Sequence, residues 1–146
     1  MDYDVLAGEF IKKIQQLGKA KLQKKITDCM RCEAFMLQYI ALNEGHALPS
    51  QISDEMNLST ARVAAALNSL EHKNLITRSI DPRDRRRILV ELSPSGRTLA
   101  REHARMLLEE TTAMLRMLGE RDAEEYVRIT GKLAEQTTIN NAQLWR

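Results

Sequence analysis

An arginine-rich segment in the middle of the chain carries a local excess of positive charge. Residues 78–87 hold two aspartates, Asp81 and Asp84, against five arginines, namely Arg78, Arg83, Arg85, Arg86 and Arg87. Guanidinium groups at the tip of a narrow loop suit an A·T-rich minor groove, where the negative potential of DNA is strongest. The Asp84 carboxylate can hold Arg86 extended and so reduce the entropy that its side chain loses on binding. A solvated charged loop is the competing interpretation when such a run is considered alone.

A second group of candidate residues lies just upstream and follows helical spacing. Arg62 is suited to a bidentate contact with guanine, and Asn68 to a contact with adenine or with a phosphate. Ser59 has two candidate roles, capping its own helix and contacting a phosphate. An ordinary solvated helix face is the alternative for this group. Together the DNA-binding candidates are Ser50, Ser59, Thr60, Arg62, Ala65, Asn68, Ser69, Arg78, Arg83, Asp84, Arg85 and Arg86.

Two short helices must position the upstream group. Pro49-Ser50 is typical of a helix start before residues 51–56, and Ser59 is typical of another before residues 60–73. Asn57-Leu58 leaves room between them for only a tight turn. The second helix has one apolar stripe (Val63, Leu67, Leu70) and an opposite stripe without large apolar residues (Arg62, Ala65, Asn68, Ser69, His72). This pattern is typical of a helix-turn-helix.

The hydrophobic period changes after residue 74. Residues 75–79 and 88–92 are rich in β-branched and aliphatic side chains, and they flank Asp81-Pro82 and the charged run. We expect a β-hairpin whose mobile basic tip covers Ile80–Arg87. Ser93-Pro94 then combines a good N-cap with a good first helical residue, which predicts another helix from residue 94 to residue 118.

Helices are predicted on both sides of this central motif. Residues 4–24 are amphipathic, Thr27-Asp28 supplies an N-cap for an apolar helix over residues 30–43, and a last helix begins at Asp122. Their apolar faces exceed what the motif can cover, so we expect burial against a second chain. The fold class is therefore mainly α with a small β-hairpin wing. We expect a single domain over residues 1–146, with the winged helix-turn-helix at about 48–92 and dimerisation helices at about 4–24 and 94–146.

The central residues resemble the MarR family of bacterial regulators. The resemblance rests on Asn57-Leu58-Ser59, on Leu70-Glu71, on 81–86 (Asp-Pro-Arg-Asp-Arg-Arg) and on 90–96 (Val-Glu-Leu-Ser-Pro-Ser-Gly). It implies a homodimer whose recognition helices enter successive major grooves of a pseudo-palindromic operator and whose wings enter the flanking minor grooves. It also implies that Arg86 is the minor-groove arginine and Asp84 its supporting partner. Ala65 departs from the family pattern, which often has a polar or basic residue there, so base reading from the middle of the helix is expected to be weaker.

The resemblance further implies release from DNA by a small aromatic ligand or by thiol oxidation. The expected ligand pocket includes Met30, Met36 and Tyr39, although methionines at helical spacing are more often core residues. Cys29 and Cys32 form a CxxC near basic residues at a helix start, which favours a thiolate and a redox switch. Inert cysteines and a metal site are the alternatives, and nothing in the linear spacing assembles the further ligands that zinc needs.

Composition limits the remaining classes of function. The formal net charge of +2 is too mild to identify a nucleic-acid partner by itself. The start of the sequence has no secretory signal and no stretch is apolar enough to span a membrane, so we expect a cytoplasmic protein.

We expect no enzyme and no cofactor. The rivals are a redox-active CxxC thiol protein, which the helical surroundings of the cysteines disfavour, and a winged-helix module that binds protein, which the arginines of the wing disfavour.

Overall fold

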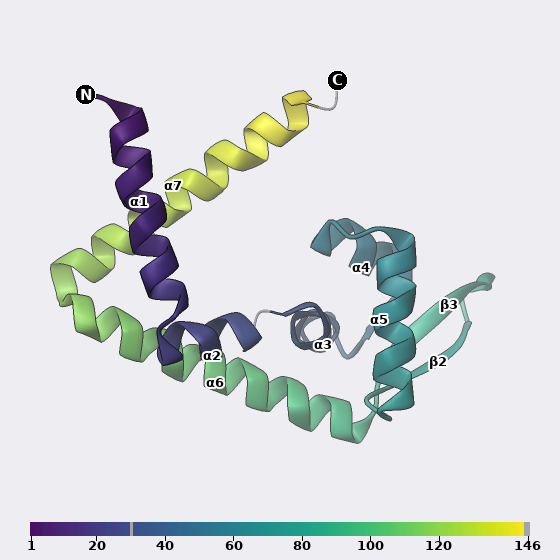
Figure 1. The fold of residues 1–146 in the computed structure, drawn as a ribbon. Helices are drawn as coiled ribbons and strands as arrows, with labels where there is room; N and C mark the ends of the chain where they lie inside the picture. The colour runs from purple at the N-terminus through teal and green to yellow at the C-terminus, as the bar shows by residue number, and fades with distance from the viewer. Residues whose placement is uncertain (30, 145–146) are drawn as a thin grey trace. The chain divides into compact units, whose positions relative to one another are not determined.

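The structure is a computed structural model that describes residues 1–29 and 31–144, apart from the side chains of residues 28, 29 and 138–144. It forms two compact units, residues 1–108 and 109–146. The elements are α1 (Tyr3–Gly18), α2 (Lys21–Cys29), α3 (Cys32–Leu42), β1 (His46–Ala47), α4 (Pro49–Met56), α5 (Thr60–His72), β2 (Ile76–Asp81), β3 (Asp84–Leu92), α6 (Pro94–Leu118) and α7 (Glu120–Leu144), as Figure 1 shows. The predicted fold class, mainly helical with a winged helix-turn-helix, is confirmed. The single-domain prediction and its division into motif and dimerisation helices remain predictions.

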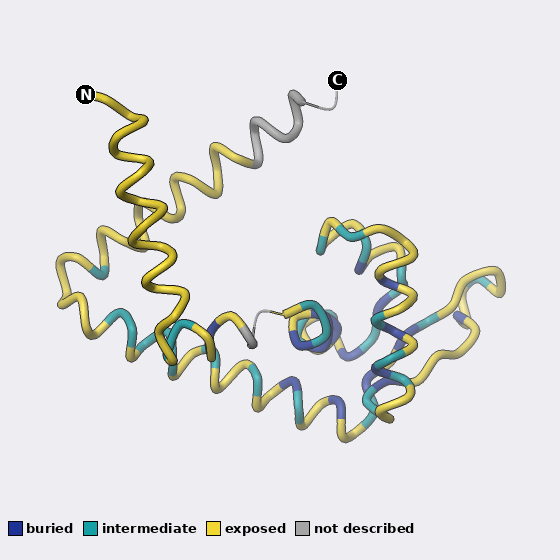
Figure 2. The backbone as a smooth tube through the Cα atoms, in the orientation of Figure 1, coloured by how far each residue is buried: buried dark blue, intermediate teal, exposed yellow. Residues whose placement is uncertain are grey.

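One hydrophobic core organises the first unit. It is built from α3, α4, α5, the sheet and the first turns of α6, and its buried residues are Met36, Leu37, Ile40, Ala47, Ile52, Val63, Leu67, Leu70, Ile76, Val90, Leu92 and Ala100. These elements carry most of the dark blue segments of Figure 2. The core residues of α5 are those of the predicted apolar stripe. The helix α5 is therefore held on its inner side by packing in the core, and its opposite side is exposed.

The wing is longer and more regular than the sequence suggested. The strands β2 and β3 pair in antiparallel fashion from Ile76↔Leu92 to Ile80↔Ile88 and then Asp81↔Asp84, with an irregularity between Ile80 and Asp81. The strands therefore extend into the expected tip over Ile80–Arg87 and leave only Pro82 and Arg83 between them, while the mobility of the tip remains a prediction. The sheet also has a third strand that the sequence did not reveal, since β1 pairs with β3 through Ala47↔Val90.

The start of α6 lies very close to the winged motif. Ser93 caps this helix as predicted, because the Gly96 N–H donates to Ser93 Oγ at 3.0 Å. Ser93 also binds the preceding connection, since its N–H donates to Leu75 O at 3.0 Å and its hydroxyl to Asn74 O at 2.7 Å. A Cβ added at Gly96 would lie 2.0 Å from Leu75 O. Only glycine allows the helix to approach the backbone this closely.

The N-terminal third differs from the expectation in its helix boundaries. The segment predicted as one helix over residues 4–24 is divided into α1 and α2. The predicted N-cap at Thr27-Asp28 is wrong: the Thr27 hydroxyl donates to Gln23 O inside α2, and Arg31 occupies the N-cap position of α3. Among the described residues, no helix is long and apolar enough to cross a membrane.

Candidate nucleic-acid interface

A left-handed residue sets the angle between α4 and α5. Asn57 ends α4 with a φ of 50°, a backbone conformation that asparagine tolerates better than most residues. The turn is held by Leu58 N–H, which donates to Ser53 O at 3.1 Å, and by Ser53 Oγ, which donates to Leu58 O at 2.6 Å. Ser59 then caps α5, since its hydroxyl accepts from Arg62 N–H at 3.2 Å. The capping role expected for Ser59 is therefore present, and a phosphate contact remains a prediction.

The outer face of α5 brings most of the predicted helical candidates together. Thr60, Arg62, Ala65 and Asn68 are all exposed, on the side of the helix away from its core residues. Ser50, in the first turn of α4, is exposed as well. Because these residues are exposed, they are accessible to bases and phosphates that line a DNA groove.

Ser69 lies differently from the other candidates. It is half-buried, and its hydroxyl donates a hydrogen bond to Glu33 of α3. Glu33 also accepts from Lys73 Nζ at 2.6 Å, and the hydrogen bond from Lys73 is the main reason that the pKa of Glu33 is lowered. These hydrogen bonds connect the C-terminal part of α5 to α3, and this geometry favours a structural role for Ser69. Its contact with DNA remains an untested prediction.

Arg78, expected to contact DNA from the wing, links the wing to α5, and its contact with DNA remains a prediction. Its Nε donates to Glu71 Oε2 at 3.1 Å and its Nη2 to Glu71 Oε1 at 3.0 Å, a bidentate ion pair. The same Nη2 donates to Asn68 Oδ1 at 2.6 Å. Hydrogen bonding to Arg78 lowers the pKa of Glu71, and the carboxylate in turn raises the pKa of Arg78. A wing residue and the outer face of α5 therefore share one hydrogen-bond network.

The arginines of the wing tip differ in their hydrogen-bond partners and in their exposure. The Arg86 side chain is 90% exposed, and Asp84 accepts from Arg86 Nε at 3.2 Å and from Arg86 Nη2 at 3.3 Å. The Arg86 side chain is the main cause of a lowered pKa at Asp84, and the Arg86 backbone N–H adds to it. The contact between Asp84 and Arg86 that the sequence suggested is present, and the extended state of Arg86 remains a prediction. Arg83 and Arg85 are exposed beside them.

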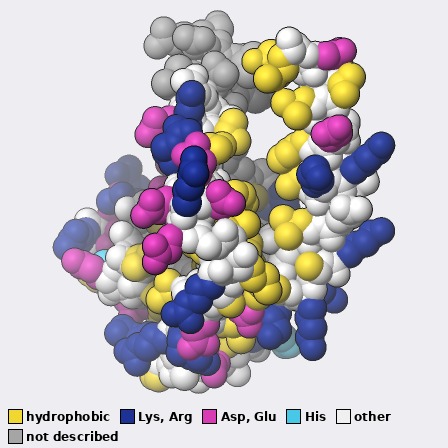
Figure 3. Space-filling model, turned by 90° about the vertical axis from the view of Figure 1, so that its left-hand side faces the viewer, with side chains coloured by type: hydrophobic (Ala, Val, Ile, Leu, Met, Phe, Trp, Pro, Cys, Tyr) yellow, Lys and Arg dark blue, Asp and Glu magenta, His cyan; other side chains and the backbone are white. Residues whose placement is uncertain are grey.

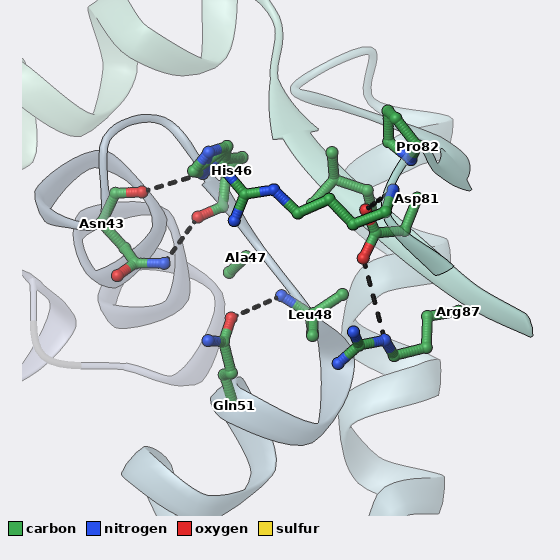
Figure 4. A pocket seen from close by; sticks show the side chains of 10 residues that line it. Asn43, His46, Ala47, Leu48, Gln51, Asp81, Pro82 and Arg87 are labelled. Carbon is green, nitrogen blue, oxygen red and sulfur yellow. Dashed lines mark hydrogen bonds and ion pairs between the residues drawn. The ribbon is translucent and has the colours of Figure 1, made fainter. Parts of the chain in front are cut away.

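Arg87 and Asp81 form an ion pair close to the turn of the wing. Asp81 is buried and accepts from Arg83 N–H at 2.9 Å, while Arg87 Nε lies 3.8 Å from Asp81 Oδ2 and 3.4 Å from Asp84 Oδ2. Figure 4 shows Asp81 and Arg87 beside a cavity of about 460 Å³ that is also lined by β1 and the first turn of α4. Leu48 N–H donates there to Gln51 Oε1 at 2.9 Å. Asp81 thus neutralises part of the wing charge, and Arg87 is the least free of the wing-tip arginines.

The residues expected to control the protein are only partly described. Met36 is fully buried in the core and Tyr39 is half-buried against it, which favours packing roles, and neither lines the cavity of Figure 4. Cys32 is a free, half-buried thiol in the first turn of α3. The Cys29 side chain and Met30 lie outside the described residues. Within the described part of the chain, no group of three or more His, Cys, Asp or Glu residues could hold a metal ion.

Comparison with known proteins agrees with this geometry. A family model described as "MarR family" matches residues 32–87. The Bacillus subtilis protein YwhA, described as an uncharacterized HTH-type transcriptional regulator, is 28% identical over 143 residues, which cover 92% of this chain and all of YwhA. Both names agree with a helix-turn-helix in the central part of the chain.

Two solved structures share the fold at lower sequence identity. The S. aureus MepR–DNA complex has a TM-score of 0.65 at 23% identity, covering 94% of this chain and 98% of MepR. Bordetella bronchiseptica BpsR, whose structure concerns regulation of DNA binding by 6-hydroxynicotinic acid, has a TM-score of 0.66 at 24% identity, covering 89% and 91%. The family match over residues 32–87 and the relative make the central part of the chain similar to the MarR family of transcriptional regulators, and the solved structures share its fold, in which the capped α5 lies beside an arginine-bearing wing.

Proposed function

We propose that the protein is a repressor that binds a pseudo-palindromic operator as a homodimer. The observation that carries this proposal is the placement of an exposed polar helix face, on α5, next to a wing whose exposed Arg86 is paired with Asp84. An α-helix fits the major groove of B-DNA, and an extended arginine fits a narrow minor groove. Two copies would present two such pairs about one helical turn apart.

Each exposed candidate has a role that follows from its chemistry. Arg62 reads guanine through two N–H donors, and Ala65 offers only a methyl group, which suits the methyl of thymine. Ser50, Ser59 and Thr60 lie at helix starts, where hydroxyl and backbone N–H groups bind phosphate. The remaining contacts, from Arg83, Arg85 and Arg86 in the wing, supply the electrostatic part of the affinity.

The homodimer is proposed from apolar side chains that the single chain leaves in water. The helix α1 buries none of its residues, although Leu6, Phe10 and Ile14 recur on it at helical spacing. The helix α7 likewise exposes Tyr126 and Leu133, and Figure 3 shows hydrophobic side chains between the charged ones on one face of the molecule. Exposed apolar surface of this kind marks an interaction site. A second copy of the chain is the occupant that a two-fold operator requires.

Dimer formation is tested by light scattering after size exclusion on wild type and Phe10→Glu. We expect a wild-type dimer and a variant shifted towards monomer, because a buried charge without a partner is costly. Glu9→Gln, on the polar side of α1, serves as the matched control and should remain dimeric. A monomeric wild type at micromolar concentration would refute the homodimer.

DNA binding is tested by titrating labelled fragments of genomic DNA with the full chain at rising salt. We expect the affinity to fall steeply, because each phosphate contact releases counterions. A winged-helix module that binds protein instead would show no DNA affinity even at low salt, and that result would refute the proposal. A repressor, in contrast to an activator, lowers expression of a reporter placed behind its operator.

Release by a small aromatic ligand or by oxidation of Cys29 and Cys32 is the finer part of the proposal. The similarly folded BpsR supports the first route, since its structure concerns regulation of DNA binding by 6-hydroxynicotinic acid. The half-buried thiol of Cys32, in the first turn of the helix that binds α5 through Glu33, supports the second. DNA affinity is compared for wild type and Cys32→Ser with 6-hydroxynicotinic acid, with peroxide and with reductant. Equal responses of the two proteins to peroxide would refute the thiol route.

A further inference from the structure

The outward orientation of the Asn68 amide is set by Arg78. A guanidinium group has only donors, so an amide that faces it must present its oxygen. Arg78 Nη2 lies 2.6 Å from Asn68 Oδ1, a short charge-assisted hydrogen bond. Turning the amide by 180° would place the Asn68 NH₂ group against the cation, with the loss of this hydrogen bond. The Asn68 side chain is therefore oriented in one way only.

Arg78 is itself immobilised. Its two contacts with Glu71 form a fork that fixes the plane of the guanidinium, and the Arg78 side chain is only 30% exposed. The third contact, to Asn68, comes from an N–H that this fork already orients. Within the described residues, no acceptor receives a hydrogen bond from Asn68 Nδ2. Asn68 therefore offers two free N–H donors on the exposed side of α5.

We propose that Arg78 is a positioning residue that makes Asn68 a donor-only reader, so that Asn68 selects against cytosine at the base it faces. This rests on the proposed placement of α5 in the major groove. There guanine, adenine and thymine each present at least one acceptor, whereas cytosine presents only its N4 donor. An unrestrained asparagine could turn and accept from cytosine N4. With its oxygen held by Arg78, Asn68 meets cytosine donor against donor.

The same geometry changes the role that the sequence suggested for Asn68. A bidentate contact with adenine needs an Asn oxygen that accepts from adenine N6 while NH₂ donates to N7. In the structure that oxygen is directed at Arg78 by a short hydrogen bond, so the part of the amide that faces away from Arg78 is its NH₂ group. The contact left to Asn68 is donation to a purine N7, to guanine O6 or to thymine O4. Asn68 thus excludes one base more strongly than it selects another.

The test is a selection from random duplex DNA with the full-length protein, followed by affinities for all four bases at each position of the selected site. For wild type we expect one position per half-site at which cytosine is disfavoured by about tenfold, the order of one base contact. In Arg78→Leu the Asn68 amide can rotate, and we expect this discrimination to fall to about threefold or less. In Asn68→Asp the side chain only accepts, and we expect cytosine to become the preferred base there.

Arg128→Leu is the matched control, because Arg128 forms a similar surface pair with Glu125 on α7, with N–O distances of 2.8 and 2.5 Å. It loses the same charge and should keep the wild-type base preference. Variants that lower affinity equally for all sequences would overturn the proposal and leave Arg78 a purely structural link. A consensus that wild type and variants share at every position would also overturn it. If wild type selects no consensus, the proposed operator binding fails and this inference fails with it.

Discussion

Replacing Gly96 with alanine would insert a methyl group into the contact between α6 and the winged motif. The added Cβ would lie 2.0 Å from Leu75 O, 3.0 Å from Leu75 C and 3.3 Å from Leu92 Cδ2. The nearest of these atoms belong to backbone and cannot rotate away. The first turn of α6 must therefore move by about 1 Å to restore even a tight carbon–oxygen contact of 3.0 Å.

The cost of that movement can be worked from the contacts it disturbs. Overpacking a close contact destabilises a protein by about 1–3 kcal/mol. Ser93 connects α6 to the winged motif through two hydrogen bonds, to Leu75 O and Asn74 O. The loss of each would lower the free energy of unfolding by about 1 kcal/mol. Alanine recovers up to about 1 kcal/mol through its better helix propensity. We expect a net loss of about 2–4 kcal/mol, which lowers the unfolding midpoint by roughly 5–15 °C for a chain of this length.

Thermal and urea unfolding followed by circular dichroism measure this loss. Gly131→Ala is the control, because Gly131 lies within α7 and a Cβ there meets nothing within 4 Å. That variant should be stabilised by about 0.5–1 kcal/mol, the ordinary gain from replacing a helical glycine. A Gly96→Ala protein as stable as Gly131→Ala would refute the argument that close approach to Leu75 requires glycine.

Three further outcomes follow from the contacts of single side chains. Arg86→Ala should leave the unfolding midpoint unchanged, lower DNA affinity by at least about tenfold and reduce the log–log salt slope by about 1, as measured by fluorescence anisotropy; a smaller loss than for Asn68→Ala would contradict the role given to the wing. Met36→Ala should destabilise the protein by about 2–5 kcal/mol in urea unfolding, and a neutral result would contradict its place in the core. The lowered pKa of Glu33 contributes stability that is present above its usual value of 4.5 and is lost as the pH falls through the lowered value. The unfolding midpoint of wild type should therefore fall below about pH 4.5 more steeply than that of Glu33→Gln, and parallel profiles would contradict the ion pair with Lys73.

The central motif could be predicted from the sequence because its signals are local. Ser59 and the Ser93-Pro94 pair mark helix starts through caps that involve only neighbouring residues, and both caps are present in the structure. The strand β1 could not be predicted in this way. It has two residues, and its pairing with β3 depends on a partner more than forty residues away. No local pattern encodes such a contact.

The candidate site was predicted in outline, and the errors have a common cause. Helical periodicity placed Ser69 on the outer stripe of α5, but it cannot say where α3 packs, and the hydrogen bond to Glu33 depends on that packing. The carboxylate of Glu71 was missed for the same reason. Its position seven residues before Arg78 is a usable signal only once the chain is known to reverse between α5 and β2. The charged residues between Ile80 and Arg87 were also predicted to form a loop. An exposed β-hairpin leaves charged side chains in solvent just as a loop does, so their charge does not distinguish the two.

The incomplete third strand of the sheet has a consequence for the behaviour of the protein in concentrated solution. Because β1 pairs with β3 only near Val90, the part of β3 from Asp84 to Leu89 has an edge without a strand partner among the described residues, and so has the outer side of β2. Open strand edges are templates for association between chains, and charged side chains are the usual protection against it. The arginines of the wing therefore also keep the hairpin from joining a hairpin of another molecule. Variants that remove several of them at once should lose solubility as well as affinity for DNA.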